Sequence, residues 1–224
     1  MFEKLDSTKY QFSSTVYNKE FGNILSKIIS CYKLMLDNNV ILVNDENKIR
    51  DVLLIDYLKN NQMRNKLGLT DYLFDKEVPE DTTTGRTDIK IQTQNTFKDT
   101  RAYYIIECKR LDAINQKGIS GLNAEYIKNG IYRFTSGLYS TFYKTNGMIG
   151  LIIASMDIDN NVLDINTLLR NSFSQINTIQ ELQKRPLRND FDFSFCSLHK
   201  TNPTNKSITL YHLMFDFSSN ISYT

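Results

Sequence analysis

An apolar run that ends in charged residues is the feature that most constrains how this chain folds. Residues 103–106 are Tyr, Tyr, Ile and Ile, and Glu107 and Lys109 follow directly. Because successive side chains on a strand point to opposite faces, Glu107 and Lys109 share one face and Cys108 takes the other. A run that is apolar on both faces predicts a central strand covered on both sides. Charged groups at its end would be partly buried, which proteins rarely tolerate without a use.

A second strand-like segment carries a further carboxylate. Residues 88–91 alternate between polar and apolar side chains, and the polar residues 94–100 can close a hairpin with the run at 103. Asp88 would then lie beside Glu107 and Lys109. Two carboxylates and an ammonium at one end of a sheet predict a divalent-metal site, since Mg²⁺ is held by one or two carboxylates plus other oxygens. The alternative is a surface hairpin that ends in an ion pair worth about 0–1 kcal/mol.

Composition narrows the class of protein but does not choose the function. The 224 residues are 41% hydrophobic and 23% charged, which is typical of one soluble domain covering 1–224. The net charge of +2 gives no general attraction to nucleic acid, although a local basic cleft would be enough for a nuclease. Three scattered cysteines predict a reduced, cytoplasmic setting, and the longest apolar window, 148–156, is too short to span a membrane. No secretory signal and no membrane partner are expected.

The order of predicted elements indicates an α/β fold with a mixed sheet. Residues 1–18 read as a loose arm, 80–85 as a turn-rich connection and 111–122 as a loop near the site. Apolar residues at spacings of three and four predict helices at 19–36, 46–62, 124–143 and 163–182. Strands are predicted at 72–78, 88–91, 103–110, 148–155, 191–195 and 208–217, with the strand at 148–155 parallel to the one at 103–110 and the last two forming a hairpin.

Other polar residues admit two interpretations each. Glu46 lies one turn before Ile49 on the buried stripe of its helix, so it either points inward to the site or complements the helix dipole. The basic cluster at 184–188 is either a solvated helix end or a DNA-backbone contact. His199 and His212 have no ligand-spaced partner and are interpreted as structural.

The order Asp88, Glu107, any residue, Lys109 resembles the signature of the PD-(D/E)xK nuclease superfamily. The preceding residues 85–87, Gly, Arg and Thr, also resemble the turn before that family's first acidic residue, with Thr87 in place of the name-giving proline. The resemblance covers about residues 44–160. It implies a restriction-endonuclease-like fold, a three-layer α/β/α sandwich around a central mixed β-sheet. Within it, 1–43 would be an N-terminal arm and helix, 44–160 the catalytic core, and 161–224 a helix and C-terminal β-hairpin.

The resemblance also implies roles for single residues. Asp88, Glu107 and the backbone carbonyl of Cys108 would hold Mg²⁺, for which Mn²⁺ can substitute, and Lys109 would orient water or stabilise negative charge near it. Glu46 matches the acidic residue that many members carry on a helix before the sheet. The basic residues expected to contact nucleic acid are Arg86, Arg110, Lys128 and Arg133.

The function implied is that of a Mg²⁺-dependent phosphodiesterase, an endodeoxyribonuclease acting in defence against foreign DNA. Because no second domain is available for recognition, a homodimer or a partner protein of a defence system is expected to contribute. The alternative is a catalytically inactive module of the same fold that binds nucleic acid or protein. Binding of divalent metal separates the two functions.

Overall fold

The computed structural model describes residues 12–80, 86–139, 142–202 and 204–222. Among these, seven strands form one mixed sheet in the order β2-β3-β4-β5-β8-β7-β6. Its strands are β2 (Leu73–Pro79), β3 (Arg86–Gln92), β4 (Tyr103–Leu111), β5 (Thr145–Ile152), β6 (Thr178–Lys184), β7 (Ser194–Lys200) and β8 (Ser207–Asp216). A small parallel pair joins β1 (Leu42–Val43) to β9 (Ile221–Ser222).

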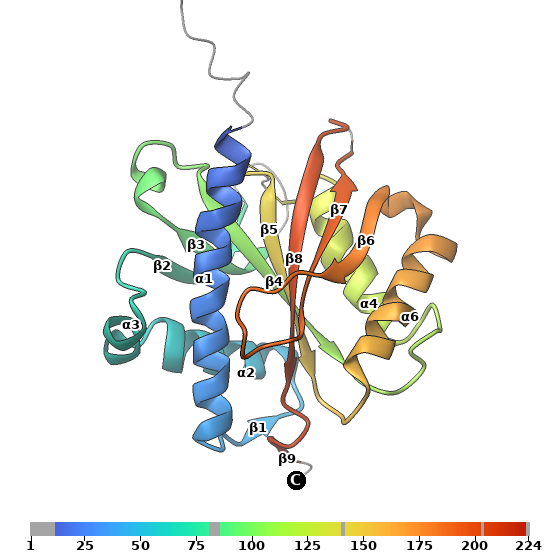
Figure 1. The fold of residues 1–224 in the computed structure, drawn as a ribbon, viewed down its shortest axis with the longest axis horizontal. Coiled ribbons are helices and arrows are strands. Elements are labelled where there is room, and N and C mark those ends of the chain that lie inside the picture. The colour runs from blue at the N-terminus through green and yellow to red at the C-terminus, as the bar shows by residue number, and fades with distance from the viewer. Residues whose placement is uncertain (1–11, 81–85, 140–141, 203, 223–224) are drawn as a thin grey trace, which may run out of the picture.

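Helices cover both faces of this sheet, as the alternating and doubly apolar strands predict. On one face pack α1 (Phe12–Asp37) and the π-helix η2 (Val52–Leu58). The other face carries α4 (Leu122–Tyr126), the π-helix η4 (Ile127–Ile131), α5 (Tyr132–Thr135) and α6 (Ile158–Asn171). Figure 1 shows α1 along one side of the sheet, with α4 and α6 on the other. The remaining described helices are α2 (Glu46–Asp51), α3 (Asn61–Leu67) and the 3₁₀ turns η3 (Gln94–Phe97) and η5 (Ser174–Ile176).

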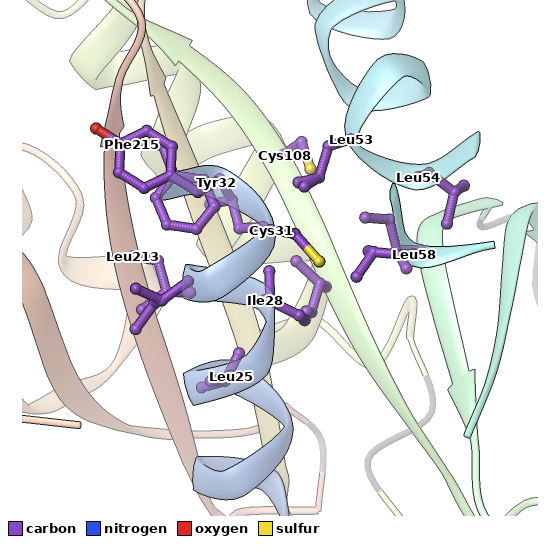
Figure 2. Close-up of a cluster of buried hydrophobic side chains, with 14 of the residues drawn as sticks. Leu25, Ile28, Cys31, Tyr32, Leu53, Leu54, Leu58, Cys108, Leu213 and Phe215 are labelled. Carbon is purple, nitrogen blue, oxygen red and sulfur yellow. The ribbon is translucent and has the colours of Figure 1, made fainter. Parts of the chain in front are cut away.

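The core under α1 shows why this helix forms where it does. Its apolar residues recur every three or four positions, so one stripe faces the sheet. In Figure 2 this stripe, with Leu25, Ile28 and Tyr32, lies between the strands and η2. The rings of Tyr32 and Phe215 stack with centroids 4.3 Å apart. Cys108 of β4 joins the same cluster, so its side chain faces away from Glu107 and Lys109, as strand alternation predicts.

Strand pairing confirms the central predictions. β3 and β4 are antiparallel with Ile89 opposite Ile106, so they form the predicted hairpin around residues 94–100. β4 and β5 are parallel, as expected from the helices that connect them. β7 and β8 form the predicted antiparallel pair, although the first strand spans Ser194–Lys200 rather than the expected 191–195. β8 also runs parallel to β5 in the middle of the sheet. The α/β class with a mixed sheet is therefore confirmed, and the restriction-endonuclease-like assignment stays a prediction.

Several predicted helix limits are wrong. The helix expected over 19–36 begins at Phe12, so 12–18 are helical rather than part of a loose arm, while residues 1–11 lie outside the described part of the chain. The helix expected over 46–62 ends at Leu58, and the side chain of Asn60 caps a new helix. The helix expected over 124–143 ends at Thr135. The connection expected at 80–85 is described only at Glu80.

The largest error concerns the helix expected over 163–182. α6 ends at Asn171, and residues 178–182 belong to the edge strand β6. Asn177 has a φ of 52°, in the left-handed region, which no helix interior adopts. Ile179 matched the helical spacing, but its side chain is 49% exposed on the edge strand. The basic cluster at 184–188 therefore begins at the last residue of the strand β6. The interpretation of that cluster as a helix end is wrong as well.

Among the described helices, none is long and apolar enough to cross a membrane.

Candidate functional site

The site begins where the β3–β4 ladder stops. The last pair toward this end is Ile89 with Ile106, and beyond it the backbone of β4 is no longer bonded to β3. Asp88 Oδ2 accepts the Cys108 N–H at 2.8 Å. Glu46 Oε2 accepts the Arg110 N–H at 3.0 Å. Two carboxylates thus take the place of a neighbouring strand, which satisfies the backbone donors and fixes both side chains at the edge of β4.

Lys109 lies at the centre of these carboxylates. Its Nζ is 2.8 Å from Glu46 Oε1 and 2.9 Å from Glu107 Oε1. The same atom is 2.8 Å from the Cys108 carbonyl oxygen and 3.9 Å from Asp88 Oδ2. The side chain of Lys109 is buried. The structure therefore brings together the residues that the sequence analysis proposed as metal ligands, around a single cationic atom.

Glu46 reaches the site from the start of α2. Asp45 caps this helix by accepting the Lys48 N–H at 2.9 Å. Glu46 is the first helical residue, so it also lies at the positive end of the helix dipole. Its side chain is 30% exposed and bonds to both Lys109 and the backbone of β4. Of the two interpretations for Glu46, its position agrees with the inward one.

Glu107 is fully buried on the face that packs against η4 and α5. Tyr139 lies with its hydroxyl 2.6 Å from Glu107 Oε2, and Arg133 Nη1 is 3.1 Å from Oε1. Burial and the charge of Asp88 raise the pKa of Glu107 to about 7, although Lys109, Arg133 and Tyr139 oppose this rise. Glu107 Oε1 forms ion pairs with Lys109 and Arg133, but within the described structure neither contact has the geometry of a hydrogen bond.

Asp88 is held by a residue that the sequence analysis missed. Arg50 is 1% exposed, and its Nη1 donates to Asp88 Oδ1 at 3.0 Å. Its Nη2 donates to Asp51 and to Glu77, each at 2.8 Å. Burial alone would lower the pKa of Arg50, but these three carboxylates raise it above its ordinary value. The backbone of Glu77, which pairs with Arg50, has a φ of 47°, in the left-handed region that residues other than glycine rarely adopt.

A signal for Arg50 was present in the sequence. Arg50 precedes Leu53, Leu54 and Tyr57 at spacings of three, four and seven, so it occupies a position on the buried stripe of its helix. An arginine there needs paired acids, because an unpaired buried charge is costly. Tyr139 gave no such signal, since it lies beyond the end of α5, in the part of the expected helix over 124–143 that is not helical.

The four basic residues proposed to contact nucleic acid lie in different surroundings. Arg133 reaches Glu107 and donates to the Tyr139 hydroxyl at 2.6 Å. Arg86 lies beside them, with its side chain 64% exposed and its carbonyl 2.5 Å from the Tyr139 hydroxyl. Arg110 donates to Asn44 Oδ1 at 2.7 Å, which ties β4 to the segment before α2. Lys128 is exposed and donates to the Ile119 carbonyl at 2.6 Å, away from the carboxylates.

The two histidines lie in the core, as predicted for structural residues. The hydroxyl of Ser197 lies 2.7 Å from Nε2 of both His199 and His212. Tyr126 and Thr178 complete the row, at 2.7 Å from His212 Nδ1 and 3.1 Å from His199 Nδ1. Burial lowers the pKa of His199 to about 3 and that of His212 well below its ordinary range.

The donors around Lys109 fit a hard divalent cation in their chemistry. Carboxylate and carbonyl oxygens are the ligands that Mg²⁺ and Mn²⁺ take, and Glu107 Oε1 is a buried oxygen without a hydrogen bond. The distances between these oxygens suit the Lys109 ammonium. In the described residues, no group of three or more His, Cys, Asp or Glu side chains already has a metal-binding arrangement. The residues that would hold the ion are Asp88, Glu107 and the carbonyl of Cys108, with Glu46 beside them.

The site is marked by charge rather than by a deep cavity. A cavity of about 480 Å³ lies toward the other end of β3, where Lys90, Gln92 and Phe97 are among the residues that line it. Asp88 and Glu107 do not line this cavity. The converging carboxylates therefore define the candidate site.

No family model, curated protein or solved structure matches this chain. The assignment of a function therefore rests on the contacts described above.

Proposed function

We propose that this protein is a Mg²⁺-dependent nuclease that hydrolyses phosphodiester bonds in DNA. The observation that supports the proposal is the convergence of Glu46, Asp88 and Glu107, with the Cys108 carbonyl, on one cation position occupied by the Lys109 ammonium. Three carboxylates crowded at a sheet edge repel one another, so they attract a cation between them.

Each residue has a task in this reaction. Asp88, Glu107 and the Cys108 carbonyl hold the ion, which when bound lowers the pKa of water and offsets charge on the phosphate. Lys109 donates a hydrogen bond to the attacking water or to a phosphate oxygen. The water oxygen bonds to phosphorus, the bond from phosphorus to one deoxyribose oxygen breaks, and a proton from the water ends on the departing oxygen. In this proposal Arg133, which pairs with Glu107, and the exposed side chain of Arg86 contact flanking phosphates.

The test uses three single variants and a panel of nucleic acids. Asp88→Ala, Glu107→Ala and Lys109→Ala are each expected to abolish Mg²⁺-dependent cleavage of duplex, single-stranded or branched DNA, with RNA as a comparison substrate. Glu181→Ala is the matched control, because Glu181 lies on the edge strand β6, where it pairs with the exposed Arg170 of α6, and its loss should leave cleavage unchanged. Melting curves establish that each variant folds. Cleavage that survives the change at Glu107 would refute the proposal.

One observation favours the second candidate, a module that binds nucleic acid without cleaving it. The carboxylates at the site are already neutralised by Lys109, Arg50 and Arg133, so the cluster is stable without a metal. Titration with Mg²⁺ and Mn²⁺ separates the two functions, since a nuclease site binds the ion and an inactive one does not. A homodimer or a partner protein from a defence system remains a prediction for either function.

A further inference from the structure

The ammonium of Lys109 makes the contacts that a bound cation would make. Its Nζ lies within 2.9 Å of a Glu46 oxygen, a Glu107 oxygen and the Cys108 carbonyl. These are hydrogen-bonding distances, and Asp88 Oδ2 completes the surroundings at 3.9 Å. The carboxylates share this one ammonium, while Arg50 and Arg133 bind Asp88 and Glu107 from outside.

We propose that Lys109 serves as the site's internal cation, and that a divalent ion binds only when this ammonium leaves the oxygens. The inference rests on the proposed function and adds a regulatory step to it. Mg²⁺ binds oxygen at about 2.0–2.1 Å, so an ion on these oxygens would lie within a few ångströms of the present Nζ position. Two cations cannot share that space, because their repulsion in a poorly solvated site is large.

The exposed fractions of the side chains around Lys109 indicate the direction in which its ammonium can leave. The Lys109 side chain is 10% exposed and that of Glu46 is 30% exposed, whereas Glu107 is fully buried. The site therefore opens on the side of Glu46. The stem of Lys109 lies against η4, where a Cβ on Gly130 would come within 3.5 Å of Lys109 Cγ and 2.4 Å of Met148 Cε. The stem of Lys109 thus lies close to η4, and the exchange moves the amino end of the side chain.

This exchange of cations links the binding of the metal ion to the hydrolysis of the phosphodiester. In the metal-free site Lys109 is bonded to carboxylates and cannot serve a substrate. Once the ion takes over the oxygens, the ammonium is released at the entrance, where a phosphate oxygen or the attacking water can accept its hydrogen bond. The lysine therefore weakens metal binding and becomes available only when the metal is in place.

The first experiment measures Mg²⁺ affinity of the full chain by isothermal titration. Lys109→Gln should bind Mg²⁺ roughly tenfold or more tightly than the unchanged protein, because a unit charge within hydrogen-bonding distance of the ligands is removed. Lys117→Gln is the control, since the Lys117 side chain is 82% exposed and lies 3.9 Å from Asp164. Equal or weaker binding by Lys109→Gln would contradict the inference.

The second experiment detects the release itself in the unchanged protein, so it does not depend on how a variant folds. Acetic anhydride modifies free amines, and mass spectrometry reports the modified fraction at Lys109 and Lys117. Adding Mg²⁺ should increase modification at Lys109 severalfold and leave Lys117 unchanged. If Mg²⁺ binds and Lys109 stays protected, the exchange is refuted while the nuclease proposal stands. If neither the unchanged protein nor Lys109→Gln binds Mg²⁺, both fail together.

Discussion

Two buried polar clusters lie on this sheet, and they differ in charge. Around β4, the clustered groups are acids and bases joined by ion pairs, and Glu107 Oε1 contacts two cations without a hydrogen bond of good geometry. Across β6, β7 and β8, Ser197, His199 and His212 form a row of neutral groups, and every nitrogen of the two rings has a partner. The histidine row satisfies its own hydrogen bonds, as structural polar groups do. The Lys109 cluster concentrates like charges near the surface, which indicates a use beyond stability.

The largest expected effect comes from removing the cation that holds Asp88 in the charged cluster. Arg50→Met should lower the free energy of unfolding by about 3–5 kcal/mol, because Asp88, Asp51 and Glu77 lose their shared partner. Urea unfolding measures the change. Arg170→Met, which breaks the exposed pair with Glu181, should cost about 1 kcal/mol or less. Equal losses in the two variants would mean that the Arg50 network adds no stability.

The two clusters should respond to acid in opposite directions. His199 and His212 have lowered pKa values, so their contribution to stability is present above pH 6.5 and is lost as the pH falls. Glu107 has a pKa raised to about 7, so it binds a proton more readily when folded and gains stability as the pH falls toward 4.5. Each group changes the free energy of unfolding by about 1.4 kcal/mol per pH unit within its window.

Between pH 6.5 and 5 the two histidines outweigh Glu107, so the protein should lose about 1.4 kcal/mol per pH unit, measured by urea unfolding at several pH values. Glu107→Gln should make this loss about twice as steep. The double change His199→Asn and His212→Asn should reverse its sign. A slope that neither change alters would show that these groups titrate alike in the folded and unfolded chain.

A smaller effect is expected within the histidine row. Ser197→Ala removes the hydroxyl between two buried ring nitrogens, and both of them lose that partner. The free energy of unfolding should fall by about 1–2 kcal/mol, measured by chemical denaturation at pH 7.5. Ser174→Ala, at an exposed position, should change it by less than about 0.5 kcal/mol. No difference between these variants would mean that water or a neighbour replaces the lost bond.

The smallest effect on stability should come from Tyr139→Phe, which removes a hydroxyl shared by Glu107, Arg133 and the Arg86 carbonyl, at a net cost of about 1 kcal/mol. Because the tyrosine lowers the pKa of Glu107, that pKa should rise further in the variant. Nuclear magnetic resonance of the labelled Glu107 carboxyl carbon can follow this titration. Tyr132→Phe, at an exposed tyrosine of the neighbouring α5, serves as control and should leave both quantities unchanged.

The sequence predicted the central strands and the residues gathered at their end, for identifiable physical reasons. Strand alternation is a strict rule, so Glu107 and Lys109 had to share a face once β4 was recognised. The hairpin then required Asp88 to lie near them. Arg50 lies on the buried stripe of its helix, but it was missed because two of the acids that pair with it, Glu77 and Asp88, are distant in sequence. β6 was taken for a helix because Phe173, Ile176 and Ile179 match helical spacing, while the left-handed backbone at Asn177 has no apolar signature.

The central claim is that the oxygens of Asp88 and Glu107 share one divalent cation. A crystal of the full chain soaked in Mn²⁺ tests it through the anomalous scattering of the metal. The account predicts a single peak about 2.0–2.3 Å from an oxygen of each carboxylate, with the Lys109 ammonium displaced toward Glu46 and the solvent. A peak bound elsewhere, or Lys109 still seated among the carboxylates at saturating Mn²⁺, would contradict it.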